Sequence, residues 1–139
     1  MRYPKKDRGF TLIELLLAIS IIALISSLVL YGQRHEQKKR RDVQRVSNIS
    51  EVQKGLALYL SETGGYPVYT GCLTGADPVS EGLRNYNYVG PDTNLADPLN
   101  PTDVTSCYYY DGNGSRYTLR YTLETNSTIG EAGDHIVVP

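Results

Sequence analysis

One carboxylate, Glu14, stands at the start of a stretch that carries no other charge from Leu15 to Leu30. From Phe10 to Tyr31 the apolar segment has the roughly 20 residues that an α-helix needs to cross a bilayer. An ionised group costs about 2.5–3.5 kcal/mol at the centre of such a span and less near its end. Because something must offset this cost, we interpret Glu14 as functional, against the alternative that it reaches the interface and is merely tolerated.

Basic residues flank the apolar segment on both sides. Arg2, Lys5, Lys6 and Arg8 precede it, and Arg34 and residues 38–41 follow it. A secretory signal would end at a cleavage site of small residues, whereas this run passes directly into charged residues. The sequence therefore predicts a retained membrane helix. Since both flanks are basic, the positive-inside rule does not orient it.

Apolar residues continue beyond the charged turn at spacings typical of one face of an amphipathic helix. This stripe consists of Val43, Val46, Ile49, Val52, Leu56, Tyr59 and Leu60. We expect Asp42, Arg45 and other polar residues to lie on the remaining faces. No proline interrupts residues 10–63, so we predict one helix of about 50 residues. Gly64-Gly65-Tyr66-Pro67 is a helix stop.

Turn-forming residues dominate the next segment, residues 68–106. Four prolines follow Asp, Gly or Asn in this segment, at Pro78, Pro91, Pro98 and Pro101. Such dipeptides favour turns, so we expect an irregular connector with at most a short helix around residues 80–85.

A hairpin follows the connector. We predict a strand at residues 107–110, a turn at residues 111–114, and a second strand at residues 117–124 in which apolar and polar residues alternate. Residues 135–138 are a candidate third strand. The predicted fold class is α+β: a long N-terminal helix, membrane-spanning in its first half and amphipathic in its second, packed on an antiparallel sheet of about three strands.

Cys72 and Cys107 are the two cysteines of the chain. An even count in a small extracytoplasmic domain favours a disulfide over two buried thiols. The bond would hold the connector against the first hairpin strand and contribute roughly 3–4 kcal/mol to stability.

The sequence offers no pattern for catalysis and only a short basic run as a signal for nucleic-acid binding. The two histidines, His35 and His135, belong to no Ser-His-Asp order, phosphate-binding loop or metal-spaced cluster. We therefore assign no catalytic residue and no metal ligand, and predict that the protein is not an enzyme. Residues 38–41 could suggest binding to DNA or to anionic lipid, but we interpret them as a solvated basic helix turn just beyond the membrane. The net charge of -1 gives no general attraction to nucleic acid, and none is assigned as a partner.

Gly9-Phe10-Thr11-Leu12-Ile13-Glu14-Leu15, with the basic leader before it and the apolar segment after it, resembles the processing site of type IV prepilins and type II secretion pseudopilins. The positions of Tyr66-Pro67 and Asp97-Pro98 resemble the layout of G-type major pseudopilins and of some major pilins. The resemblance implies the pilin fold and a structural filament subunit.

Family roles transfer to the residues that match this motif. The resemblance implies that prepilin peptidase removes the cytoplasmic leader, residues 1–9, by cutting between Gly9 and Phe10, and then N-methylates Phe10. It implies that Glu14 meets the N-terminal amine of a neighbouring subunit during filament assembly. It also implies that residues 10–31 form the transmembrane and later filament-core helix, and that residues 32–139 form the extracytoplasmic globular domain.

The resemblance also implies a location and partners. The precursor would be a single-pass protein of the cytoplasmic membrane, later assembled in a pilus or pseudopilus. Its expected partners are further copies of itself in a helical filament, prepilin peptidase, the membrane and an inner-membrane assembly platform.

Two departures from the family pattern affect these expectations. Many relatives carry a proline within the apolar helix, where this chain has Tyr31-Gly32. Gly32 would be the point of any local unwinding. Several G-type relatives bind calcium in an acidic C-terminal loop, and the comparable residues 124–134 supply oxygen ligands without a clear acidic pattern. Calcium there is an open alternative with no assigned site.

Several functions share this N-terminus. A surface type IV pilus and a secretion pseudopilus both remain open, whereas minor tip pilins often lack the glutamate that this chain has. The rival from another class is a monomeric, membrane-anchored extracytoplasmic binding module. It predicts an intact leader and a dispensable Glu14.

Overall fold

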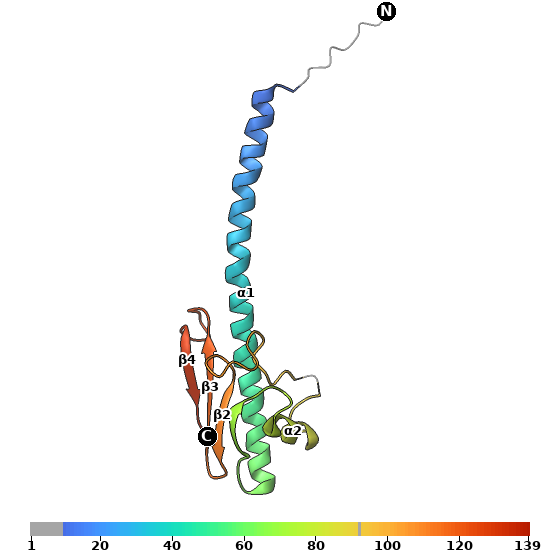
Figure 1. Ribbon diagram of the computed structural model, residues 1–139, viewed down its shortest axis with the longest axis vertical. Coiled ribbons are helices and arrows are strands. Elements are labelled where there is room, and N and C mark those ends of the chain that lie inside the picture. The colour runs from blue at the N-terminus through green and yellow to red at the C-terminus, as the bar shows by residue number, and fades with distance from the viewer. Residues whose placement is uncertain (1–9, 92) are drawn as a thin grey trace, which may run out of the picture. The chain divides into compact units, whose positions relative to one another are not determined.

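The computed structural model describes residues 10–91 and 93–139, with the backbone alone for residues 30–32. The predicted leader, residues 1–9, lies outside the described residues, and so does Gly9 of the predicted cleavage site, which is its last residue. The chain divides into two compact units, the first ending at Gln37 and the second spanning Lys38–Pro139 (Figure 1).

Helix α1 begins at Leu12 and ends at Thr63, and its apolar part forms the first unit. Side chains from Leu12 to Val29 are all exposed. The three serines in this stretch donate their hydroxyl protons to carbonyl oxygens three or four residues earlier, at 2.8 Å in each case. Because these hydroxyls are satisfied inside the helix, they are compatible with lipid contact. Helix α1 contains a window long and apolar enough to cross a membrane.

The second unit packs the remainder of α1 against a four-stranded sheet (Figure 1). Its elements after α1 are β1 (Val68–Cys72), α2 (Pro78–Asn85), β2 (Tyr109–Asn113), β3 (Tyr117–Leu123) and β4 (Gly133–Val137). The strands lie in the order β1-β2-β3-β4, and each pair is antiparallel. The α+β class with a long N-terminal helix is therefore confirmed.

The core forms where the amphipathic stripe of α1 meets the tyrosine-rich face of the sheet. Ile49, Val52 and Leu56 of the stripe are at most 2% exposed. From the sheet side the core receives tyrosine and leucine side chains, together with leucines of α2 and the connector; these are Leu73, Leu83, Leu95, Tyr108, Tyr110, Tyr117 and Leu119. This packing confirms the predicted stripe at Ile49, Val52 and Leu56 and the alternation in β3.

Two polar residues of α1 contradict the predicted pattern. Asp42 and Arg45, expected on the solvated faces, are 0% and 3% exposed, while Val43 of the predicted stripe is 50% exposed. The hydropathy pattern predicted exposure for Asp42 and Arg45 because charged residues are rarely buried unless they are paired. Here they are paired with each other and with residues far along the chain.

The sheet has one strand beyond the about three that were expected. Strand β1 lies in the segment predicted to be an irregular connector, and it forms by pairing along β2, with Gly71 opposite Tyr110. Its five residues have too short an alternation to stand out among the prolines and glycines around them. The short helix expected nearby is present as α2, and the Asp77 side chain caps it by accepting hydrogen bonds from Val79 N and Ser80 N.

The hairpin turn also lies later than expected. Strand β2 continues through Asp111 and Gly112, and the turn follows Asn113, whose side-chain oxygen accepts from the backbone N–H groups of Ser115 and Arg116. Gly112 therefore belongs to the strand and not to the turn. A glycine is needed at this position because a Cβ there would lie 2.5 Å from the Pro67 carbonyl oxygen. Gly114, with φ of 89°, takes the left-handed turn position.

Candidate functional site

The first turn of α1 is a capping box built by Thr11 and Glu14. Thr11 donates from its backbone N and its hydroxyl to the same Glu14 oxygen, Oε2, at 2.9 and 2.8 Å. The Glu14 backbone N donates to Thr11 Oγ1 at 3.3 Å. This reciprocal pair satisfies N–H groups that a helix start would otherwise leave unbonded. A Thr-x-x-Glu signal was present in the sequence, but sequence reasoning did not use it.

The capping box fixes the orientation of the Glu14 carboxylate. Oε2 is occupied by Thr11, whereas Oε1 accepts no hydrogen bond from the residues that the structure describes. The carboxylate lies at the positive end of the helix dipole, which favours its ionised form. Phe10 lies two residues before the first residue of α1 and is 86% exposed. An anionic oxygen is thus held in place and open to a donor from outside the chain.

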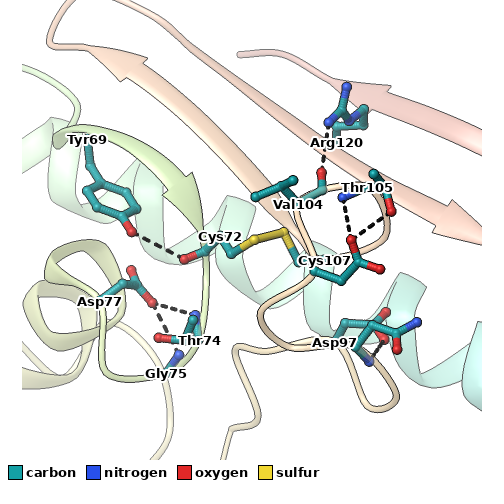
Figure 2. Close-up of a disulfide and its surroundings, with 12 residues drawn as sticks. Tyr69, Cys72, Thr74, Gly75, Asp77, Asp97, Val104, Thr105, Cys107 and Arg120 are labelled. Carbon is teal, nitrogen blue, oxygen red and sulfur yellow. Dashed lines mark hydrogen bonds between the residues drawn. A yellow bond between two sulfur atoms is a disulfide. The ribbon is translucent and has the colours of Figure 1, made fainter.

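The second unit is held together by a disulfide between Cys72 and Cys107, shown in Figure 2. Their Cα atoms are 5.7 Å apart and the cysteines are 35 residues apart in sequence. The bond joins the last residue of β1 to the segment that enters β2, and Leu73 N donates to the Tyr108 carbonyl oxygen beside it at 2.8 Å. Residues 73–106 are the part of the predicted connector that lies between β1 and β2, and the name is kept for them from here on. Both ends of this connector are therefore fixed at one point of the sheet.

An ion cluster fixes the connector a second time. The Arg45 guanidinium contacts three carboxylates: Asp97 at 2.6 Å, Glu124 at 2.6 Å and Asp42 at 2.9 Å. Arg41 forms a second, two-pronged contact with Glu124, at 2.7 and 2.6 Å. Asp97 belongs to the connector, and Glu124 follows β3 directly. The cluster therefore links α1, the connector and the end of β3.

Asp42 completes the cluster from the helix side. Its two oxygens accept hydrogen bonds from the backbone N–H groups of Glu124 and Thr125 and from the Thr125 hydroxyl, at 2.7–2.9 Å. Burial opposes ionisation, but these bonds and the one from Arg45 outweigh it and lower the pKa of Asp42. A carboxylate with this many donors stays charged even when buried.

The other members of the cluster are also held in their charged forms. The hydrogen bond from Arg41, opposed by burial and reinforced by Arg45, lowers the pKa of Glu124 to about 2. Burial works against the charged form of Arg45, yet its bonds to Asp97 and Glu124 are stronger and raise the pKa of Arg45. Sequence reasoning missed this cluster, and the only available signal was the charge of Asp42 and Arg45 next to an apolar stripe.

The cluster also changes the interpretation of residues 124–134. Both oxygens of Glu124 accept from arginines, Asn126 Oδ1 accepts from Ala132 N, and Asp134 accepts from the Thr122 hydroxyl. Over the described parts of the chain, no group of three His, Cys, Asp or Glu side chains is placed to hold a metal ion. The oxygen ligands considered for calcium are thus largely committed to the protein itself.

The fold and the N-terminal geometry together define an α+β protein with an apolar helix that opens on a capped glutamate. Residues 4–30 match the prokaryotic N-terminal methylation motif. Over 67 residues the chain is 34% identical to the type II secretion system core protein G of Escherichia coli strain K12, a stretch covering 48% of this chain and 46% of that protein. The chain spans about half the length of this curated relative. No solved structure matches.

The comparisons confirm the resemblance drawn from residues 9–15. The chain carries a prepilin-type N-terminus and is similar to a pseudopilin. Glu14 and Phe10 lie within the matched motif, and the helix that follows them is the candidate membrane span.

Proposed function

We propose that this protein is a structural subunit of a helical filament, a pseudopilus of the type II secretion kind. The observation that carries the proposal is the capped Glu14 carboxylate at the start of an apolar helix whose side chains are exposed from Leu12 to Val29. The likeness to the core protein G covers 67 residues, more than the motif at residues 4–30 spans, and this favours secretion over a surface pilus.

Processing would create the partner of Glu14. Prepilin peptidase would cut between Gly9 and Phe10 and methylate the new amine of Phe10, which stays positively charged. This ammonium from one subunit would meet Glu14 Oε1 of its neighbour while Thr11 holds Oε2. A charge left unpaired in an apolar surrounding costs several kcal/mol. The pair would therefore select the correct axial register between subunits.

The apolar helix would supply the filament core. In the membrane its exposed side chains contact lipid, and in the filament they would contact the same helix of other subunits. Lipid and leucine side chains are equally apolar, so the exchange needs little net energy from the helix itself. The family's peptidase and inner-membrane assembly platform are the proposed processing and assembly partners.

The disulfide supports an extracytoplasmic location for the globular unit. Disulfides persist in oxidising compartments outside the cytoplasm. Together with the motif at residues 4–30, this supports the proposed topology: residues 1–9 in the cytoplasm, residues 10–31 in the membrane and residues 32–139 on the extracytoplasmic side. The domain has a structural role in this proposal, with no catalytic residue.

Counting fibres by electron microscopy tests the proposal. Cells with the peptidase and the secretion assembly platform would express the wild-type chain, Glu14→Ala, or the control Glu36→Ala, which removes an exposed glutamate from the same helix outside the apolar run. We expect fibres from the wild type and from Glu36→Ala, and at least a tenfold loss for Glu14→Ala at equal membrane level, because about 1.4 kcal/mol corresponds to a factor of ten.

The alternative is a monomeric, membrane-anchored binding module. A wild-type chain that stays monomeric and keeps its leader beside active peptidase and platform would support that alternative and refute the filament. Normal fibres from Glu14→Ala would refute the register role alone.

A further inference from the structure

Three consecutive cations on α1 have no role in the function proposed above. Lys38, Lys39 and Arg40, which we call the basic turn, are all exposed. In the described part of the chain, salt bridges reach the next arginines, Arg41 and Arg45, but not the basic turn. The basic turn is therefore available to an anionic partner.

Helix geometry spreads these charges around α1. Successive residues of an α-helix are about 100° apart, so three in a row point in three directions around the axis. A ring of charge of this kind fits a partner that surrounds the helix better than one that contacts a single face.

The basic turn lies a short chain distance from the apolar run. Lys38 comes seven residues after Tyr31, which is about 10 Å of helical rise. The hydrocarbon core of a bilayer is about 30 Å thick and the whole bilayer about 40–45 Å, so each headgroup layer is about 5–8 Å thick. Lys38 would therefore lie just beyond the headgroup layer. Lysine and arginine side chains can bend toward the membrane surface, so their charges reach the depth of the phosphate groups.

A second copy of the chain is a less suitable partner for the basic turn. Among the described residues of the second unit, four exposed carboxylates each accept a hydrogen bond from a hydroxyl of their own chain. These are Glu62 with Tyr88, Asp103 with Thr105, Asp111 with Thr70, and Asp134 with Thr122. Headgroup phosphates, in contrast, are present on all sides of a membrane helix.

We propose that the basic turn binds the phosphate groups of anionic phospholipids in the leaflet next to the globular unit. This inference rests on the proposed membrane span of residues 10–31. Each basic residue near an anionic surface contributes about 1 kcal/mol, or roughly a fivefold preference. Bound lipid would hold the waiting subunit at a fixed depth, and leaving the membrane would require these contacts to be released.

Lipid retention by the full chain tests the proposal. The protein would be reconstituted without assembly machinery into vesicles of phosphatidylcholine with a minor share of phosphatidylglycerol, and the lipids kept after mild extraction would be counted by native mass spectrometry. We expect phosphatidylglycerol to be enriched. Lys38→Gln/Lys39→Gln should lower the enrichment at least about tenfold, from two fivefold terms, and Lys38→Arg/Lys39→Arg should keep it.

The matched control is Lys54→Gln/Arg116→Gln, which removes two exposed cations elsewhere in the same unit. It should leave the enrichment unchanged. Inorganic phosphate should compete no better than chloride at equal ionic strength, because the proposed ligand is a lipid in a membrane and not a free anion.

Several results would overturn the proposal. They are equal retention of the two lipids by the wild type, the same loss in the control, specific competition by inorganic phosphate, or oligomers in pure phosphatidylcholine that depend on Lys38 and Lys39. If carbonate treatment removes the wild-type chain from the vesicles, both this proposal and the proposed membrane span would be overturned. Stable insertion without lipid preference would overturn this proposal alone.

Discussion

The buried side chain of Arg45 forms ion pairs on which the stability of the globular unit depends. It is 3% exposed and neutralises the carboxylates of Asp42 and Asp97, of which the first is 0% and the second 2% exposed. Removing one member of a buried ion cluster leaves the others uncompensated, which typically costs about 3–5 kcal/mol.

Arg45→Gln should therefore lower the free energy of unfolding by about 3–5 kcal/mol. Urea unfolding of the full chain in detergent, followed by the near-ultraviolet signal of the tyrosines, measures this change. The control Lys54→Gln, at an exposed position of the same helix, should change stability by less than about 0.5 kcal/mol. Equal stability of Arg45→Gln and wild type would show that the cluster does not hold the connector.

The acid stability of the unit should follow Glu124. Its pKa is lowered to about 2 by Arg41 and Arg45, while an unfolded glutamate titrates near 4.3. A lowered folded-state pKa gives stability that is complete above the unfolded value and is lost as the pH falls toward the folded one. The melting temperature should thus drop between about pH 4.5 and 2, and Glu124→Gln should show a shallower drop. An identical pH profile in the two proteins would contradict this assignment.

The connector is the element that depends most on its fixed ends. Between β1 and β2 it contains α2 and long irregular stretches, and the Cys72–Cys107 bond closes it over 35 residues. Closing a loop of this length reduces the entropy of the unfolded chain by the equivalent of about 4 kcal/mol.

Cys72→Ser/Cys107→Ser should lose about 4 kcal/mol of unfolding free energy. Urea titration of the double variant and of wild-type protein with and without reductant measures it. Reduction should shift the wild type to the midpoint of the variant and leave the variant itself unchanged. A reductant effect of similar size on the variant would show that the loss does not come from this disulfide.

Elements with a strong periodic signal could be predicted from the sequence. Helix α1 was expected over residues 10–63 and is present at Leu12–Thr63, and the alternation of residues 117–124 gave β3 at Tyr117–Leu123. Local patterns suffice there because the apolar run and stripe of α1 and the alternation of β3 are carried by residues close together in the sequence.

Features that depend on distant partners could not be predicted in this way. Strand β1 exists because β2 pairs with it, and the hairpin turn is displaced because Asp111 and Gly112 pair with both β1 and β3. Asp42 and Arg45 are buried because Asp97, Glu124 and Thr125 meet them from more than 50 residues away. None of these contacts leaves a periodic signal near the residues that form it.

At the scale of the whole molecule, the two units differ in how they satisfy their surfaces. The first exposes its apolar side chains from Leu12 to Val29, which suits lipid or other copies of the same helix. The second buries its own core and closes it with a disulfide and an ion cluster. In the proposed function, such a chain would keep its globular unit unchanged while its helix moves from the membrane into the filament.

The intact mass of the chain recovered from cells that contain prepilin peptidase tests this account most directly. The account predicts a chain that begins at Phe10 and carries one additional methyl group on its N-terminal amine. A mass that corresponds to the unmodified chain beginning at Met1, in cells whose peptidase processes its other substrates, would contradict it.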